Sequence, residues 1–182
     1  MLKTSENPPI VFPLNSLEET TYGKWWIAHT KSRNEKVLAW MLNGWEIPYF
    51  LPLVKKVTRN KQRTLTSLLP LFSGYLFFRG DEQCRHKALT SNKIANVIEV
   101  VDQDRLTGEL TQIYRALESG LPIDPYPNLR AGDRCRVIAG PLMGAEGTLL
   151  KKKSTTRLLL EVDILGQAAA VEIDMELLEP LT

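Results

Sequence analysis

Few side chains in this sequence could carry out acid–base, nucleophilic or metal chemistry. The two histidines, His29 and His86, lie far apart, and the two cysteines, Cys84 and Cys135, are separated by 51 positions without a CxxC pair. A zinc site or a disulfide framework is therefore not expected. Because no nucleophile stands beside a base, the sequence indicates binding rather than catalysis, and we expect no cofactor and no enzyme activity.

The basic residues are a stronger signal. Residues 24–93 hold 13 Lys and Arg against 4 Asp and Glu, whereas residues 94–182 hold 9 against 14. A positive first half suits a nucleic acid or an acidic protein surface. Lys55, Lys56 and Arg59 belong to a run without acidic residues. This run either contacts nucleic acid or is simply solvated, since it contains no aromatic residue for base stacking.

Strands and helices must position these side chains. Residues 24–30 form a β-rich run, and the spacing of Ser32 and Glu35 predicts a capping box at the start of a helix that ends near Gly44. Five further elements are predicted up to residue 120: a strand near a sheet edge at 47–53, a basic hairpin with its tip at 60–61, an apolar strand at 69–78, a helix at 81–89 and a strand at 94–101. An apolar stripe from Leu106 to Leu117 then predicts a helix that Gly120 ends.

The remaining segments divide the chain. Residues 1–22 carry three prolines and no periodicity, so we expect a flexible leader. Residues 121–129 carry three more prolines and predict a stiff linker between two domains. From residue 130 to 182, a glycine-rich loop and alternating apolar residues predict five short strands that close into a small barrel.

Three stretches resemble the NusG family of transcription factors. The loop at 130–149 resembles a KOW motif, Trp25-Trp26-Ile27 matches the first strand of the N-terminal domain, and residues 70–78, PLFSGYLFF, match its central signature except that Ser73 replaces a proline. The resemblance implies an α+β chain: a ferredoxin-like split βαβ N-terminal domain, with an antiparallel sheet and helices, at 23–120, followed by an SH3-like five-stranded KOW β-barrel at 130–182.

The resemblance also implies a function, that of an elongation and antitermination factor which suppresses pausing or termination. In that family the N-terminal domain binds the clamp helices of the largest RNA polymerase subunit and reaches an opposing lobe. The implied polymerase-binding residues are Ile27, His29, Phe72, Tyr75, Arg85, His86, Lys87 and Thr90. The implied nucleic-acid-binding residues, which would include contacts with non-template DNA, are Lys31, Lys55, Lys56 and Arg59.

The KOW domain of the family recruits a small-subunit ribosomal protein or the termination factor Rho. The matching partner-binding positions here are Leu142, Met143, Ile164 and Leu165. Ala145 stands where an aromatic residue is usual, and Gln167 replaces an arginine. A smaller anchor and a lost charge-assisted hydrogen bond weaken the expectation of Rho binding.

Other interpretations stay open. A ribosome-associated RNA-binding KOW protein without a polymerase role is the main alternative, and an enzyme with a barrel appendage is a third. The sequence does not distinguish a general factor from an operon-specific, RfaH-like paralogue.

In RfaH-like members the C-terminal domain can fold as a helical hairpin, and residues 168–179 include nine good helix formers among twelve. The alternation at 158–164 and the glycines of the KOW loop instead predict a stable barrel, free of the first domain. We expect a monomer. Because no signal peptide or apolar span is present, we expect it in the cytoplasm.

Overall fold

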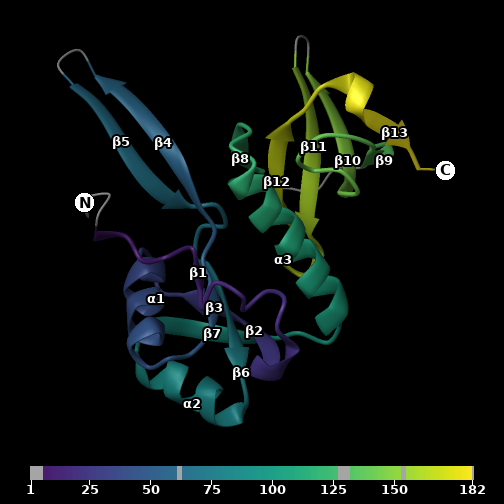
Figure 1. The fold of residues 1–182 in the computed structure, drawn as a ribbon. Coiled ribbons are helices and arrows are strands. Elements are labelled where there is room, and N and C mark those ends of the chain that lie inside the picture. The colour runs from purple at the N-terminus through teal and green to yellow at the C-terminus, as the bar shows by residue number, and fades with distance from the viewer. Residues whose placement is uncertain (1–5, 61–62, 127–131, 153–154, 182) are drawn as a thin grey trace. The chain divides into compact units, whose positions relative to one another are not determined.

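The computed structural model describes residues 6–60, 63–126, 132–152 and 155–181 (Figure 1). The chain divides into two compact units, residues 1–103 and residues 104–182, which are called here the first and second units.

The first unit contains a five-stranded antiparallel sheet. Its strands lie in the order β1 (Val11–Phe12), β3 (Tyr49–Phe50), β6 (Tyr75–Gly80), β2 (Lys24–Thr30) and β7 (Ile94–Glu99). Without β1, this is the strand order of a ferredoxin-like split βαβ fold, as the sequence predicted. The predicted edge strand is β3, which β1 covers.

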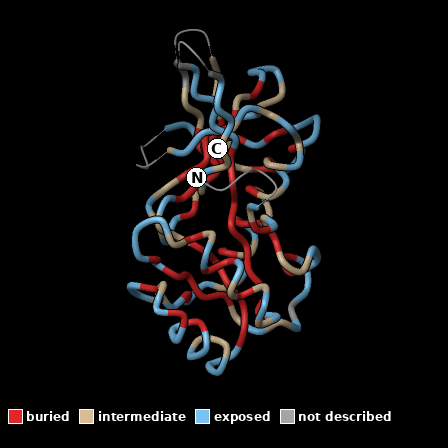
Figure 2. Tube along the Cα trace, turned by 90° about the vertical axis from the view of Figure 1, so that its left-hand side faces the viewer, coloured by how far each residue is buried: buried red, intermediate tan, exposed pale blue. Residues whose placement is uncertain are grey.

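Two helices pack on one face of this sheet. Helix α1 (Glu35–Gly44) and helix α2 (Glu82–Thr90) bury Leu38, Leu42 and Ala88 in a core shared with Trp26 and Phe78 of the central strands. Side chains alternate along a strand, so Trp25, Ile27 and His29 point to the opposite face. Figure 2 shows the buried residues running along the inner segments of the chain and the exposed ones on the outer loops.

The predicted leader is packed from residue 6 onward, which corrects the expectation of a flexible segment. Strand β1 pairs with β3, and Pro9 accepts a hydrogen bond from the Tyr49 hydroxyl at 3.0 Å. The buried Arg79 donates through Nη1 to the carbonyls of Ser16 and Glu19 at 2.9 and 2.6 Å. Tertiary partners distant in sequence fix this segment, so local periodicity could not reveal it. Residues 1–5 lie outside the described residues.

The basic hairpin is confirmed. Strand β4 (Leu53–Asn60) pairs with β5 (Arg63–Pro70) in a two-stranded sheet of its own. Of the predicted tip at 60–61, residue 60 ends β4 and residue 61 lies outside the described residues.

Helix α2 begins with a side-chain cap. Asp81 precedes the helix and accepts a hydrogen bond from the backbone N–H of Cys84 at 2.9 Å. This hydrogen bond to the charged carboxylate lowers the pKa of Asp81 from its ordinary value of 3.8.

We expect Asp81→Asn to remove a pH-dependent part of the stability of the first unit. The pKa of Asp81 is lower in the folded than in the unfolded chain, so the ionised carboxylate stabilises the fold above about pH 4, and this contribution is lost as the pH falls through the folded pKa. Urea denaturation of the wild type and the variant measures the effect. Their free energies of unfolding should differ at about pH 6, and the difference should shrink as the pH falls through the folded pKa of Asp81. A difference that did not vary with pH would show that charge plays no part in the cap.

The second unit is built on one antiparallel sheet. Its order is β13 (Leu178–Pro180), β9 (Arg134–Val137), β10 (Glu146–Lys152), β11 (Thr155–Val162), β12 (Gln167–Glu172) and β8 (Ile123–Tyr126). Two 3-10 turns, η3 (Asp163–Leu165) and η4 (Met175–Leu177), join β11 to β12 and β12 to β13. The five predicted strands are present. The last of them returns to pair with the first, which is the SH3-like arrangement.

The predicted linker at 121–129 is partly wrong. Ile123–Tyr126 form β8, which pairs with Ala168 to Val171 of β12 and extends the barrel sheet by one strand. Pro122 also accepts a backbone hydrogen bond from Glu172 at 3.0 Å. Proline is tolerated there because β8 is an edge strand. Residues 127–131 lie outside the described residues.

Helix α3 (Gln103–Glu118) carries the predicted apolar stripe. Leu106, Leu110 and Ile113 are buried, as expected. The sequence pattern predicted this helix as part of the first domain, whereas from Asp104 onward it forms part of the second unit. Within this unit α3 makes polar contacts with the barrel, which periodicity cannot predict.

Candidate functional site

An aromatic pair is the most distinctive exposed feature of the first unit. In the register of β2 and β6, His29 lies opposite Tyr75. The two rings stack with centroids 5.0 Å apart and planes 21° from parallel. His29 is exposed and Tyr75 is half-buried, so the pair offers an apolar surface with polar atoms at its edge. Such rings are common anchors in protein interfaces.

The other two residues predicted for this surface are buried. Ile27 has 0% and Phe72 1% of its surface exposed. Phe72 packs edge-on against Phe77, with centroids 6.1 Å apart and planes at 88°. Ile27 and Phe72 therefore contribute to packing in this conformation, whereas His29 and Tyr75 are accessible.

A buried carboxylate positions the loop before Tyr75. The predicted capping box is wrong: Asn34 is the N-cap residue of α1, without a side-chain cap hydrogen bond. Glu35 is instead 6% exposed, and its carboxylate accepts a hydrogen bond from Gly74 N–H at 2.8 Å. Gly74, with φ of 85°, in turn accepts a hydrogen bond from Thr30 N–H. Sequence reasoning missed this role of Glu35 because its partner is 39 positions away.

The basic and polar residues predicted on α2 lie apart from the aromatic pair. His86, Lys87 and Thr90 are exposed, and Arg85 is half-buried with its guanidinium 5.4 Å from the centroid of the Trp26 ring. Trp26 belongs to the sheet face that α1 and α2 cover, which is opposite to the face of His29. The structure thus places the two predicted polymerase-binding groups on opposite faces of one sheet.

The predicted nucleic-acid-binding residues also fall into two groups. Lys31 is exposed just after β2, and its Nζ donates to Asn92 Oδ1 at 2.6 Å. Lys55, Lys56 and Arg59 are exposed on β4 of the hairpin. No described acidic side chain forms an ion pair with any of these three hairpin residues.

The predicted partner-binding residues of the barrel lie on two loops. Met143 and Ile164 are 61% and 40% exposed, and Leu165 is partly exposed. Leu142 differs from them, because it is 1% exposed and lines a small cavity beside Ile173 and Leu177. Three of the four positions can therefore meet a partner directly.

A family comparison identifies the chain. A family model described as transcription termination factor NusG matches residues 23–116, just over half of the sequence. The chain belongs to the NusG family. NusG-family proteins are transcription factors rather than enzymes. The matched region runs from β2 to most of α3 and so includes the aromatic pair, the hairpin and α2.

Solved structures of the NusG and Spt5 type are similar to this NusG-family chain. NusG of Thermotoga maritima, from a structure of its domain interaction, is 17% identical with a TM-score of 0.47, over 87% of this chain and 97% of that chain. Spt5 in the MjSpt4:Spt5 complex is 12% identical with a TM-score of 0.30, over the same shares of each chain. No curated protein matches the chain.

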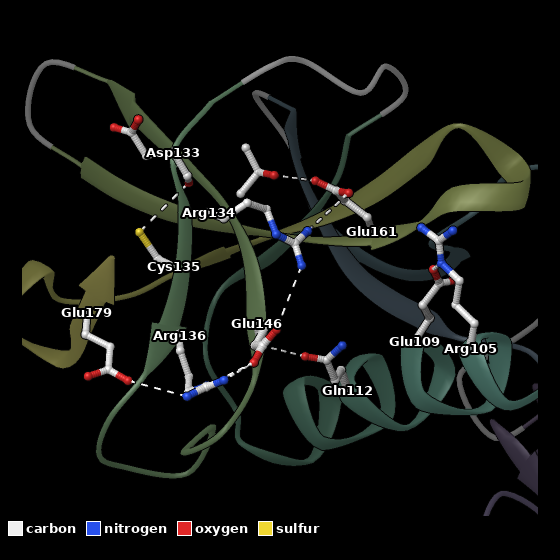
Figure 3. A network of polar contacts seen from close by, with 11 residues as sticks. Arg105, Glu109, Gln112, Asp133, Arg134, Cys135, Arg136, Glu146, Glu161 and Glu179 are labelled. Carbon is white, nitrogen blue, oxygen red and sulfur yellow. Dashed lines mark hydrogen bonds and ion pairs between the residues drawn. The ribbon is translucent and has the colours of Figure 1, made fainter. Parts of the chain in front are cut away.

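A polar network joins α3 to the barrel of this family member and was not foreseen from the sequence (Figure 3). Arg105 forms an ion pair with Asp163 at 3.0 Å, Gln112 accepts a hydrogen bond from Glu146 N–H at 2.7 Å, and Arg115 donates to the carbonyl of Met143 at 3.0 Å. The Arg105 and Arg115 contacts reach the same two loops that carry Ile164 and Met143. Exposed and buried residues alternate along β9. This alternation could be seen in the sequence, but it does not indicate where the helix packs.

Two further charged groups support this network. Burial raises the pKa of Glu109, although the backbone N–H of Asp163 and the charge of Arg105 oppose the shift. Arg136 binds Glu146 through Nε at 2.9 Å and Nη2 at 2.6 Å, a two-point contact that holds β9 and β10 together.

The described residues contain no group of three or more His, Cys, Asp or Glu side chains that could hold a metal ion. Every described helix is too short or too polar to reach across a lipid bilayer.

Proposed function

We propose that this chain is a transcription elongation and antitermination factor that binds RNA polymerase through its first unit and recruits a further factor through its barrel. The exposed stack of His29 and Tyr75, within the region that matches the NusG family, is the observation that carries the proposal. It supplies an aromatic anchor for the clamp helices of the largest polymerase subunit.

The packing beneath the pair supports this role. Glu35 fixes the Gly74 backbone, and Gly74 fixes Thr30 at the end of β2, so both rings stand on ordered chain. An anchor that is rigid before binding loses less conformational entropy when the complex forms.

The second polymerase contact is proposed for α2. Because Arg85, His86, Lys87 and Thr90 lie on the face of the sheet away from Tyr75, one rigid unit could contact two separate polymerase elements at the same time. Lys31, beside the aromatic pair in the chain, is proposed to contact non-template DNA.

The barrel is proposed to recruit a small-subunit ribosomal protein through Met143, Ile164 and Leu165. Their exposed apolar side chains lie on the loop before β10 and on η3. Ala145 is 2% exposed, so it offers little surface to a partner. Rho is therefore a weaker candidate than the ribosomal protein.

Affinity purification of the tagged full chain from a nuclease-treated lysate tests the proposal. We expect polymerase subunits to be recovered with the wild type. Recovery of ribosomal proteins without polymerase would contradict the proposed polymerase role and support a ribosome-associated KOW protein instead.

A further inference from the structure

The β4–β5 hairpin extends from the five-stranded sheet of the first unit as a two-stranded ribbon of its own (Figure 1). Each strand has eight residues, and the register pairs Leu53 with Pro70 at the base and Asn60 with Arg63 near the tip. At about 3.4 Å per residue, the ribbon is about 27 Å long. No other strand pairs with it in the described part of the chain.

The base of the ribbon is held firmly. Leu53 is buried in the core beneath α1, Lys36 Nζ donates to the carbonyl of Leu68 at 2.6 Å, and Leu71 N–H donates to the carbonyl of Pro52 at 2.8 Å. From residue 55 to residue 59 every side chain of β4 is exposed. The ribbon therefore has an ordered base and a solvated outer part.

The charge of the ribbon is entirely positive. Residues 53–70 contain five basic residues and no acidic one. Lys24 of the first unit, by contrast, has two carboxylate partners, Glu99 at 3.0 Å and Glu82 at 3.7 Å. Lys55, Lys56 and Arg59 have no such partner among the described residues. A polyanion would neutralise these charges.

The two faces of the ribbon carry groups that suit a nucleic-acid groove. Cross-strand partners share a face, so Lys55 and Arg59 lie on one face with Thr64 and Thr66, while Lys56 lies on the other with Ser67. Hydroxyl groups can donate to or accept from base edges, and the basic side chains can reach phosphates.

The same composition distinguishes among nucleic acids. The ribbon has no aromatic residue, so it lacks the stacking surface that single-strand binders use. The major groove of B-form DNA is about 12 Å wide and admits a two-stranded ribbon, whereas that of A-form RNA is deep and narrow. These properties favour a DNA duplex.

We propose that the β4–β5 ribbon binds double-stranded DNA by lying in its major groove, with Lys55, Lys56 and Arg59 on phosphates. The inference adds a ligand class to the proposed function, on which it rests for its setting, since a polymerase-bound factor works beside duplex DNA. In this proposal the ribbon binds duplex DNA, and Lys31 contacts the non-template single strand.

Binding of the full chain to three labelled probes of one sequence tests the proposal: a DNA duplex, an RNA duplex and single-stranded DNA, measured by fluorescence anisotropy. We expect the DNA duplex to bind most tightly. In the triple variant Lys55→Gln, Lys56→Gln, Arg59→Gln, the salt slope should fall by about 0.9 for each lost phosphate contact. The ratio of the wild-type affinity for the DNA duplex to that of the triple variant should therefore fall about 40-fold between about 50 and about 200 mM salt.

Controls make the outcomes decisive. Lys24→Gln removes a lysine that already has carboxylate partners, so it should leave the slope unchanged. A DNA duplex with bulky substituents at C5 of its pyrimidines, which fill the major groove, should bind more weakly than the plain duplex. Tighter binding to single strands or to RNA duplex, an unchanged slope in the triple variant, or indifference to the C5 groups would overturn the proposal.

Polymerase binding by the triple variant separates this inference from the proposed function. The variant should still recover polymerase, because His29 and Tyr75 are untouched. If the wild type binds duplex DNA as expected but recovers no polymerase, the proposed function fails and the ribbon proposal stands on its own binding data.

Discussion

Tyr75→Ala is expected to weaken binding of the full chain to RNA polymerase by at least about 30-fold, because truncating an aromatic interface anchor costs on the order of 2 kcal/mol or more. The variant also removes the ring on which His29 stacks, so the accessible surface loses its shape as well as its area. Titration of labelled chain with purified polymerase measures the change.

Tyr75→Phe is the matched control. It keeps the ring and its stacking with His29 and removes only the hydroxyl, so most of the affinity should remain. Tyr75 is a cleaner test than Phe72, whose buried ring packs on Phe77: truncating a buried phenylalanine costs about 3–5 kcal/mol of stability and would confuse folding with docking. If folded Tyr75→Ala binds polymerase as the wild type does, the docking surface is elsewhere.

Gly147→Ala is expected to destabilise the barrel more than any exposed substitution. Gly147 lies in β10 opposite Cys135 of β9, and a Cβ atom there would clash with the carbonyl oxygen of Leu159 in β11. The obstacle is backbone, so one of the two strands must move. Overpacking of this kind costs about 1–3 kcal/mol, and more where the backbone cannot yield.

Amide hydrogen exchange of β10 and β11 in the full chain would report the loss. Gly108→Ala on α3 is the matched control, because a Cβ atom there meets nothing within 4 Å. In a helix interior, replacing glycine by alanine should stabilise the fold by up to about 1 kcal/mol. Equal protection of β10 in Gly147→Ala and the wild type would show that the strands can move apart without cost.

The helical alternative for the C-terminal domain illustrates how far local propensity reaches. Ala168, Ala169 and Ala170 are strong helix formers, yet they form part of β12 and are fully buried between β11 and β8. Six register pairs between β11 and β12 and the close approach at Gly147 favour the sheet. The barrel prediction is confirmed for this conformation, while its freedom from the first domain stays a prediction.

The helices and strands that the sequence determined by itself are those encoded by local residue patterns. Alternation and helical spacing predicted β2, α1, the basic hairpin, α2, β7, α3 and the barrel strands, because each pattern records which side of one element meets a core. The signature around Tyr75 and the first-strand tryptophans indicated the NusG family, and the charge balance indicated the basic ribbon.

Only the tertiary structure decided which polar groups meet across long separations. Ser32 and Glu35 satisfied a local capping rule, but Glu35 gains more from the backbone of Gly74, where its buried carboxylate has a hydrogen-bond donor. The leader from residue 6, the strand β8 and the attachment of α3 to the barrel likewise depend on backbone carbonyls and ion pairs supplied by distant segments. Hydrophobic periodicity reports burial of a side chain but not the identity of its polar partner, so these parts of the fold could be found only in three dimensions. The same holds for the difference between the accessible Tyr75 and the buried Phe72.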